Sequence, residues 1–222
     1  MRATPTPLPN WLTTYRQPPY KNIYEICPKE SYVFGTESLY GDWDAELLIL
    51  AQDVGPADEF EKLRDAGHPH PFAHREFRPG FPRYGPAAGM GGAGTNQTIF
   101  RLAEHVSCTK LYGSALIGMC RPGADYHGTL PRPTLVRGFC VRVLRWAIDP
   151  ARMPKLRAVI CLGSLAEDYI RRATSEGPTL APVPKLIRTP HPAAHGHIGS
   201  YNAVLPTWRE MAKQMGWAFS SV

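Results

Sequence analysis

Four short apolar runs that alternate with helix-patterned segments constrain the fold of this chain more than any other feature. The runs cover residues 46–51, 111–119, 156–162 and 184–189. Unbroken apolar runs of this length are typical of strands buried on both faces, as in a parallel sheet. Helical patterns lie between and after them, at 57–66, 95–106, 133–148, 165–175 and 202–215. The alternation predicts an α/β fold, a three-layer sandwich with a central, mainly parallel four-stranded sheet and helices on both faces.

The length of 222 residues suits a single domain over 1–222, with residues 1–30 as a proline-rich N-terminal arm and helix. A hydrophobic fraction of 43% and a charged fraction of 20% exclude a disordered or fibrous chain. No apolar run is long enough to cross a bilayer, and the first residues, MRATPTPLPNW, are unlike a secretory signal. We therefore expect a cytoplasmic protein without a membrane partner.

Charge and cysteine usage narrow the choice of partner. Lys and Arg total 25 against 19 Asp and Glu, a net charge of +6. An excess of this sign favours polyanionic partners such as nucleic acids, although a surplus that serves only solubility has the same sign. The five cysteines are widely spaced and form no Cys-x-x-Cys pair, which favours reduced thiols over disulfides.

In parallel α/β sheets, ligands bind beyond the carboxyl ends of the strands, so the residues that follow each run are the candidates for chemistry. Gln52-Asp53 follows the first run, and Thr189-Pro190-His191-Pro192 follows the fourth. Taken singly, Asp53 could cap the helix that begins near residue 57, and His191 could be one side of a rigid turn. Their pairing at the same edge of the sheet favours a shared site.

These residues resemble the motifs of the uracil-DNA glycosylase superfamily, and the match runs from about Val33 to Trp217. Gln52-Asp53 is similar to that family's first motif, and His191-Pro192-Ala193-Ala194 to its second. Between them, Val159 to Ala166 (VICLGSLA) resembles the family's hydrophobic strand, Leu-Gly turn and helix. Cys120-Arg121-Pro122-Gly123 resembles a motif of the branch that holds an iron–sulfur cluster. The four motifs occur in the family's order.

The resemblance implies that the protein flips a damaged base out of DNA and hydrolyses its N-glycosidic bond. Asp53 would position the attacking water, and His191 would stabilise the departing uracil. Gln52 would contact the base, and an aromatic ring would stack on it, with Phe81 and Tyr84 as candidates; these rings could also simply pack a loop. The implied partner is DNA that contains uracil or related damaged bases, and no obligatory protein partner is evident.

Two departures from the family pattern bear on base specificity. Gly55 stands where many members place a Tyr that blocks the 5-methyl group of thymine. We therefore expect 5-substituted uracils to be accepted more readily. The segment before Cys120 lacks the Asn with which many members read the uracil edge. Base reading then falls to Ser114, to backbone groups or to other residues, and other deaminated bases become candidate substrates.

A third departure concerns the cluster. Cys120 and Cys140 match the later pair of cluster ligands in order, but Cys27 stands alone where a Cys-x-x-Cys is needed. We expect neither a cluster nor any other cofactor or metal. Arg121 and Arg188 are candidate DNA-backbone contacts, and the segment with His195, His197 and Ile198 is a candidate wedge into the minor groove. An ordinary surface loop is the competing interpretation of that segment.

Two classes of function remain open from the sequence. The first is a glycosylase that acts on uracil in DNA without a metal. The second is a non-catalytic DNA-binding protein that retains the fold and the basic surface. The presence of both Asp53 and His191 favours the enzyme, whereas the altered base-reading segment keeps the binding protein open.

Overall fold

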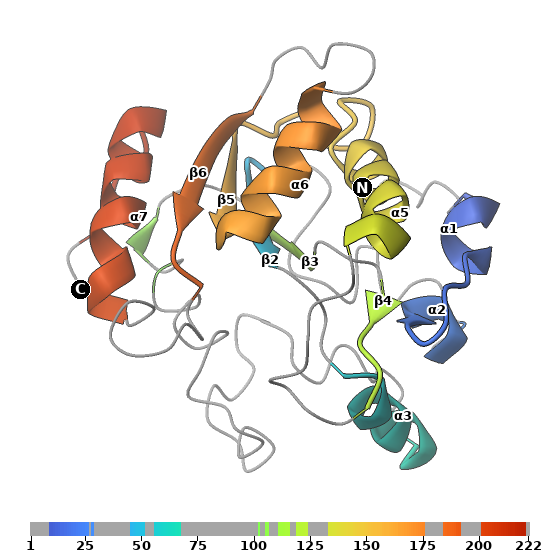
Figure 1. Ribbon diagram of the computed structural model, residues 1–222. Coiled ribbons are helices and arrows are strands. Elements are labelled where there is room, and N and C mark those ends of the chain that lie inside the picture. The colour runs from blue at the N-terminus through green and yellow to red at the C-terminus, as the bar shows by residue number, and fades with distance from the viewer. Residues whose placement is uncertain are drawn as a thin grey trace.

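The protein was analysed as a computed structural model, in which the described residues are 9–26, 28, 45–51, 56–67, 102, 105–106, 111–115, 119–123, 133–175, 184–191 and 201–220. Helices lie around a sheet of parallel strands, and the N-terminal helices lie beyond the helix that precedes β5 (Figure 1). Most of the predicted helix at 95–106 lies outside the described residues. Among the helices that the structure describes, none is both long enough and apolar enough to span a membrane.

The sheet consists of strands that all run in the same direction. Their hydrogen-bonded order is β3-β2-β5-β6, with bounds Leu111–Ala115, Leu47–Ala51, Ala158–Leu162 and Lys185–Thr189. The register pairs Leu50 of β2 with Cys161 of β5, and Cys161 in turn with Arg188 of β6. The prediction of a mixed α/β fold built on parallel strands is thereby confirmed.

Successive side chains of β2 and β5 enter two separate hydrophobic clusters, as the period-2 geometry of a strand requires. Leu48, Leu50, Val159 and Cys161 join a cluster that also contains side chains of α5 (Pro133–Ala147) and α6 (Ser164–Ser175). Leu47, Ile49, Ala158, Ile160 and Leu162 join a second cluster with side chains of α7 (Tyr201–Met215). Because both faces are buried, the two strands read as continuous apolar runs rather than as an alternation.

The helices on the sheet bury one apolar stripe each. In α6 the buried residues recur at helical spacing: Ala166, Tyr169, Ile170 and Ala173. In α7 they are Val204, Trp208, Met211 and Ala212. Pro206 lies inside α7, at its sixth residue. Burial of the apolar stripe, including the fully buried Trp208, holds the helix together despite the proline.

A second, two-stranded sheet joins the N-terminal arm to the middle of the chain. The arm consists of α1 (Asn10–Thr14), β1 (Lys21–Asn22) and α2 (Ile23–Ile26). β1 pairs antiparallel with β4 (Met119–Cys120). The prediction of one strand over 111–119 is therefore wrong, because its last residue pairs with the arm and not with the parallel sheet. α2 begins at Ile23, directly after Lys21 and Asn22 of β1.

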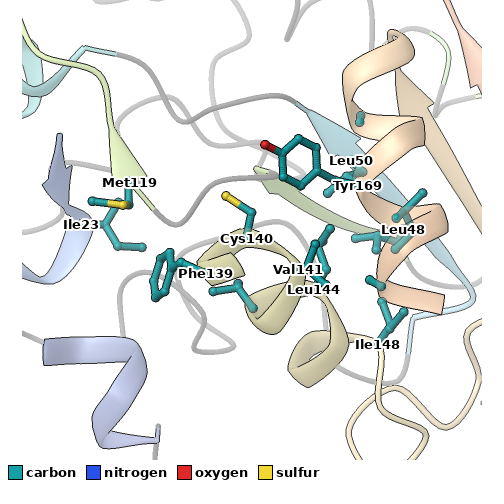
Figure 2. Close-up of a cluster of buried hydrophobic side chains, with 14 of the residues drawn as sticks. Ile23, Leu48, Leu50, Met119, Phe139, Cys140, Val141, Leu144, Ile148 and Tyr169 are labelled. Atoms are coloured by element: carbon teal, nitrogen blue, oxygen red, sulfur yellow. The ribbon is translucent and has the colours of Figure 1, made fainter. Parts of the chain in front are cut away.

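The arm is fixed to α5 by aromatic contacts. Phe139 of α5 stacks on Tyr15 with ring centroids 4.0 Å apart and also contacts Trp11 edge-on. Figure 2 shows α5 between Ile23 and Met119 on one side and Leu48 and Leu50 of the sheet on the other. The arm therefore belongs to the same hydrophobic core as the α6 face of the sheet.

Asn22 is completely buried and ties three backbone segments of the arm together. Its amide nitrogen donates to the carbonyl oxygens of Leu12, at 2.9 Å, and Tyr15, at 3.1 Å. Its side-chain oxygen accepts from the backbone N–H of Tyr24 at 3.0 Å. The buried polar groups of these turns are satisfied by this one side chain.

We expect Asn22→Ala to lower the free energy of unfolding by about 1–3 kcal/mol, because it leaves buried backbone groups without partners. Urea unfolding at constant pH measures the change. Asn10→Ala, at an exposed position in the same arm, is the matched control and should change stability by less than about 0.5 kcal/mol. Equal effects of the two substitutions would show that the Asn22 hydrogen bonds do not anchor the arm.

Candidate active site at the carboxyl ends of the strands

The order of the parallel strands identifies the end of the sheet at which a ligand-binding crevice is expected. The chain passes from β2 to β3 on one side, and β5 and β6 lie on the other side of β2. The direction of strand order thus reverses between β2 and β5. In open parallel sheets, the helices leave a ligand-binding crevice at such a point, outside the carboxyl ends of the strands. Those ends are Ala51 for β2, Leu162 for β5 and Thr189 for β6.

A tight turn follows β5 and faces His191. The N–H of Gly163 donates to the carbonyl oxygen of Thr189 at 2.9 Å, which ties the turn to the end of β6. Gly163 has a φ of +96°, a conformation that other residues rarely adopt. A Cβ atom at this position would lie 3.9 Å from the Cβ of His191. The turn therefore lies directly beside the candidate histidine, and α6 begins at the next residue.

His191 is half-buried two residues beyond the end of β6. Pro190 and Pro192 flank it in the sequence and restrict the backbone on both sides. A half-buried imidazole at the carboxyl edge of a parallel sheet can contact a ligand and still be held in one orientation. This placement is what the sequence predicts for His191.

Asp53 and most of its predicted neighbours lie outside the described residues, so their roles stay predictions. This group consists of Gln52, Asp53, Gly55, Phe81, Tyr84, His195, His197 and Ile198. The structure does describe the end of β2 at Ala51, two residues before Asp53. β2 and β6 are both neighbours of β5, so their ends are two strand spacings apart, or about 10 Å.

Two further residues predicted for the site, Ser114 and Arg121, lie on different parts of the fold. Ser114 lies on β3, in register with Leu50 of β2. Arg121 follows β4, and its residue is only 5% exposed. It forms a backbone bridge with Pro56, and its carbonyl oxygen accepts from the N–H of Ala57 at 2.7 Å. Arg121 is therefore inside the protein, beside the start of α3 (Ala57–Asp65).

Arg188 is exposed on β6. It shares an acidic partner, Glu167 of α6, with Arg171 of the same helix. Its Nη1 is 3.5 Å from Oε2 of Glu167, while Arg171 approaches Oε1 of the same carboxylate at 2.7 Å. The sequence analysis did not single out Glu167 and Arg171. Their spacing of four residues within a helical segment was the available signal, since such pairs face each other on a helix.

The contacts of His105, another described histidine, stabilise the fold. Its Nδ1–H donates to the carbonyl oxygen of Ser220 at 2.6 Å, and its Nε2 is hydrogen-bonded to the hydroxyl of Tyr201. The ring also stacks on Phe219, with centroids 5.0 Å apart. With both nitrogens bonded and 7% exposure, this ring fixes the C-terminal segment to the start of α7. The two histidines thus differ in access to a ligand.

The described cysteines are buried thiols. Cys120, Cys140 and Cys161 are buried and not joined in disulfides, and all three lie in the cluster around α5 and α6. Burial raises the pKa of the Cys140 thiol well above its usual range and raises that of Cys161 to about 12. Within the part of the chain that the structure describes, no three His, Cys, Asp or Glu side chains gather into a metal-binding group.

We expect Gly163→Ala to destabilise the protein by about 1–2 kcal/mol, because alanine is strained at positive φ. Gly138→Ala is the matched control: Gly138 is exposed in α5, and an added Cβ would have open space around it. This second substitution should stabilise the protein by about 0.5–1 kcal/mol, since glycine is unfavourable inside a helix. Urea unfolding of both variants tests the opposite signs. An unchanged free energy of unfolding in Gly163→Ala would contradict the claim that alanine is strained at this position.

The raised pKa of the Cys161 thiol predicts that the protein becomes less stable at alkaline pH. The unfolded chain loses the thiol proton near the ordinary pKa of 9.0, whereas the folded chain keeps it to about 12. The free energy of unfolding should therefore fall as pH rises above 9, by up to about 1.4 kcal/mol per pH unit for this thiol. Urea unfolding between pH 8 and pH 10.5 should show a shallower decline in Cys161→Ala than in the wild type. Parallel profiles would contradict the prediction.

Comparison with known proteins does not extend these observations. A scan against models of protein families finds no match to this chain, and a search of curated proteins finds no similar sequence. The function is therefore argued from the motifs and from the geometry of the edge at which the strands end.

Proposed function

We propose that this chain is a DNA glycosylase that hydrolyses the N-glycosidic bond of uracil in DNA. In this proposal the whole chain forms one domain of the uracil-DNA glycosylase type. Its described strands are the central four-stranded sheet of a three-layer sandwich, with the α5 and α6 cluster on one face and the α7 cluster on the other. The proposed site is the crevice between the ends of β2 and β6, in a cytoplasmic enzyme.

The observation that supports this proposal most is the position of His191. It lies beyond β6, beside the Gly163 turn, at the edge where β2 ends two residues before Asp53. A sheet of this topology binds ligands at that edge. The separation of about 10 Å between the ends of β2 and β6 leaves room for a planar base between groups that extend from each.

Cleavage of the N-glycosidic bond builds positive charge on the sugar and negative charge on the departing base. In the proposed mechanism, Asp53 holds and polarises the attacking water, and its negative charge offsets the charge that develops on the sugar. His191 donates a hydrogen bond to O2 of uracil, where the negative charge of the leaving group gathers. A donor placed in advance at such a position lowers the barrier by about 3–4 kcal/mol.

The remaining proposed contacts bind the base and the DNA. Gln52 contacts the base edge, and Phe81 or Tyr84 stacks on the flipped ring. Gly55 leaves space beside C5, so 5-hydroxymethyluracil is proposed as a substrate as well, and Ser114 is proposed as a further base-reading residue.

The proposed contacts with the DNA backbone lie around the mouth of the site. Arg188 is exposed and suited to this role. The segment with His195, His197 and Ile198 would enter the minor groove of the DNA. Arg121 is buried in the free chain, so it would have to become exposed before it could contact a phosphate.

The test is an oligonucleotide with one uracil, incubated with the protein and then cleaved by alkali at the abasic site. We expect wild-type protein to release uracil. Asp53→Asn should abolish the activity, and His191→Ala should lower kcat by about 10²–10³-fold. Asp65→Asn, at an exposed position at the end of α3, is the matched control and should retain full activity.

Binding without base release by the wild type would instead establish the non-catalytic DNA-binding protein. Retention of activity in both Asp53→Asn and His191→Ala would overturn the proposed site. The same assay with 5-hydroxymethyluracil tests the space beside Gly55, and complete refusal of the larger base would contradict it.

A further inference from the structure

One carboxylate on α6 is held by two guanidinium groups that come from different elements. Arg171, four residues further along α6, bonds Oε1 of Glu167 through Nη2 at 2.7 Å and through Nε at 3.0 Å. Arg188, on β6, approaches the other oxygen, Oε2, at 3.5 Å. Glu167 therefore fixes the spacing of the two arginines, and the group of three carries a net charge of +1.

The burial of this group is uneven. The side chain of Glu167 is 20% exposed, whereas those of Arg171 and Arg188 are 61% and 60% exposed. The anion thus lies beneath and the two cations lie outermost. A surface arranged in this way presents guanidinium N–H groups to a ligand and shields the carboxylate from it.

The group lies close to the candidate active site. Glu167 is in the first turn of α6, which begins immediately after Gly163, and Arg188 is three residues before His191. Glu167 and Arg171 also both act on the pKa of Cys161, next to the end of β5, in opposite directions. Glu167 and Arg188 are therefore near the carboxyl end of the sheet, on the face that α6 covers, and Arg171 lies one helical turn further along α6.

We propose that Arg171 and Arg188, held apart by Glu167, form a binding site for the phosphate backbone of a nucleic acid that enters the candidate active site. The choice of DNA as the polyanion rests on the proposed function. Guanidinium groups bind phosphate oxygens in a bidentate manner, and such contacts position a duplex without reading its sequence. Each guanidinium has five N–H donors, so a phosphate can bind those that point outward while Glu167 stays the partner of both arginines.

A neighbouring pair on the same helix provides the matched control. Arg172 and Asp168 form an ion pair at 2.9 Å, and this pair has no net charge. Arg172 is one residue beyond Arg171 and is therefore rotated about 100° around the helix axis. It has the same side chain on the same helix, but it is not part of the group that Glu167 holds.

The experiment measures binding of the full chain to a fluorescein-labelled duplex without uracil, by fluorescence anisotropy at several salt concentrations. Arg171→Gln and Arg188→Gln should each weaken binding and reduce the slope of log K against log salt by about 0.9, the value for one lost phosphate contact. Glu167→Gln should tighten binding roughly two- to fivefold, because it raises the net charge of the group from +1 to +2 while the amide oxygen can still accept a hydrogen bond from an arginine. Arg172→Gln should match the wild type.

Effects of Arg171→Gln and Arg188→Gln no larger than that of Arg172→Gln would overturn the proposal, and so would a failure of the wild type to bind the duplex. Unfolding temperatures of all four variants show that they are folded. Because the duplex contains no uracil, the outcome is independent of base release. A wild type that binds through these arginines but releases no uracil would sustain this site and refute the glycosylase.

Discussion

The burial of β2 and β5 on both of their faces is the constraint on which the rest of the structure depends. Each strand supplies side chains to two hydrophobic clusters, one shared with α5 and α6 and the other with α7. A strand buried in this way cannot slip by one residue without moving every side chain to the opposite cluster. The fixed register determines which strand ends meet at the carboxyl edge, and hence which loops can contribute to a common site.

The sequence predicted the strands and helices of the parallel sheet well, because their patterns are local. The apolar runs at 46–51 and 156–162 and the stripes of α6 and α7 show that these residues are buried. This can be read from the sequence without knowing which element covers them. The errors occurred where the partner is distant in the chain. Met119 reads as the end of an apolar run, and only its pairing with the N-terminal arm, nearly a hundred residues away, assigns it to a different sheet.

The candidate site was predictable to a similar degree and for a similar reason. His191 follows an apolar run between two prolines, and a residue in that position must lie near the carboxyl edge of the sheet. The burial of Arg121 could not be anticipated, because it results from packing against the start of α3. Glu167 and Arg171 were visible as a helical pair, but their joint contact with Arg188 requires the relative placement of α6 and β6.

The short segment from Met119 to Arg121 has backbone contacts on two sides. It pairs with Lys21 and Asn22 of the arm and also forms the bridge to Pro56, three residues after Asp53 in the sequence. Lys21 further contacts Glu61 of α3 at 2.7 Å. The N-terminal arm thus contacts β4 and α3, and α3 begins shortly after the candidate Asp53 in the sequence. Removal of the arm would therefore take away contacts that hold β4 and the start of α3, a short distance in sequence after the candidate Asp53.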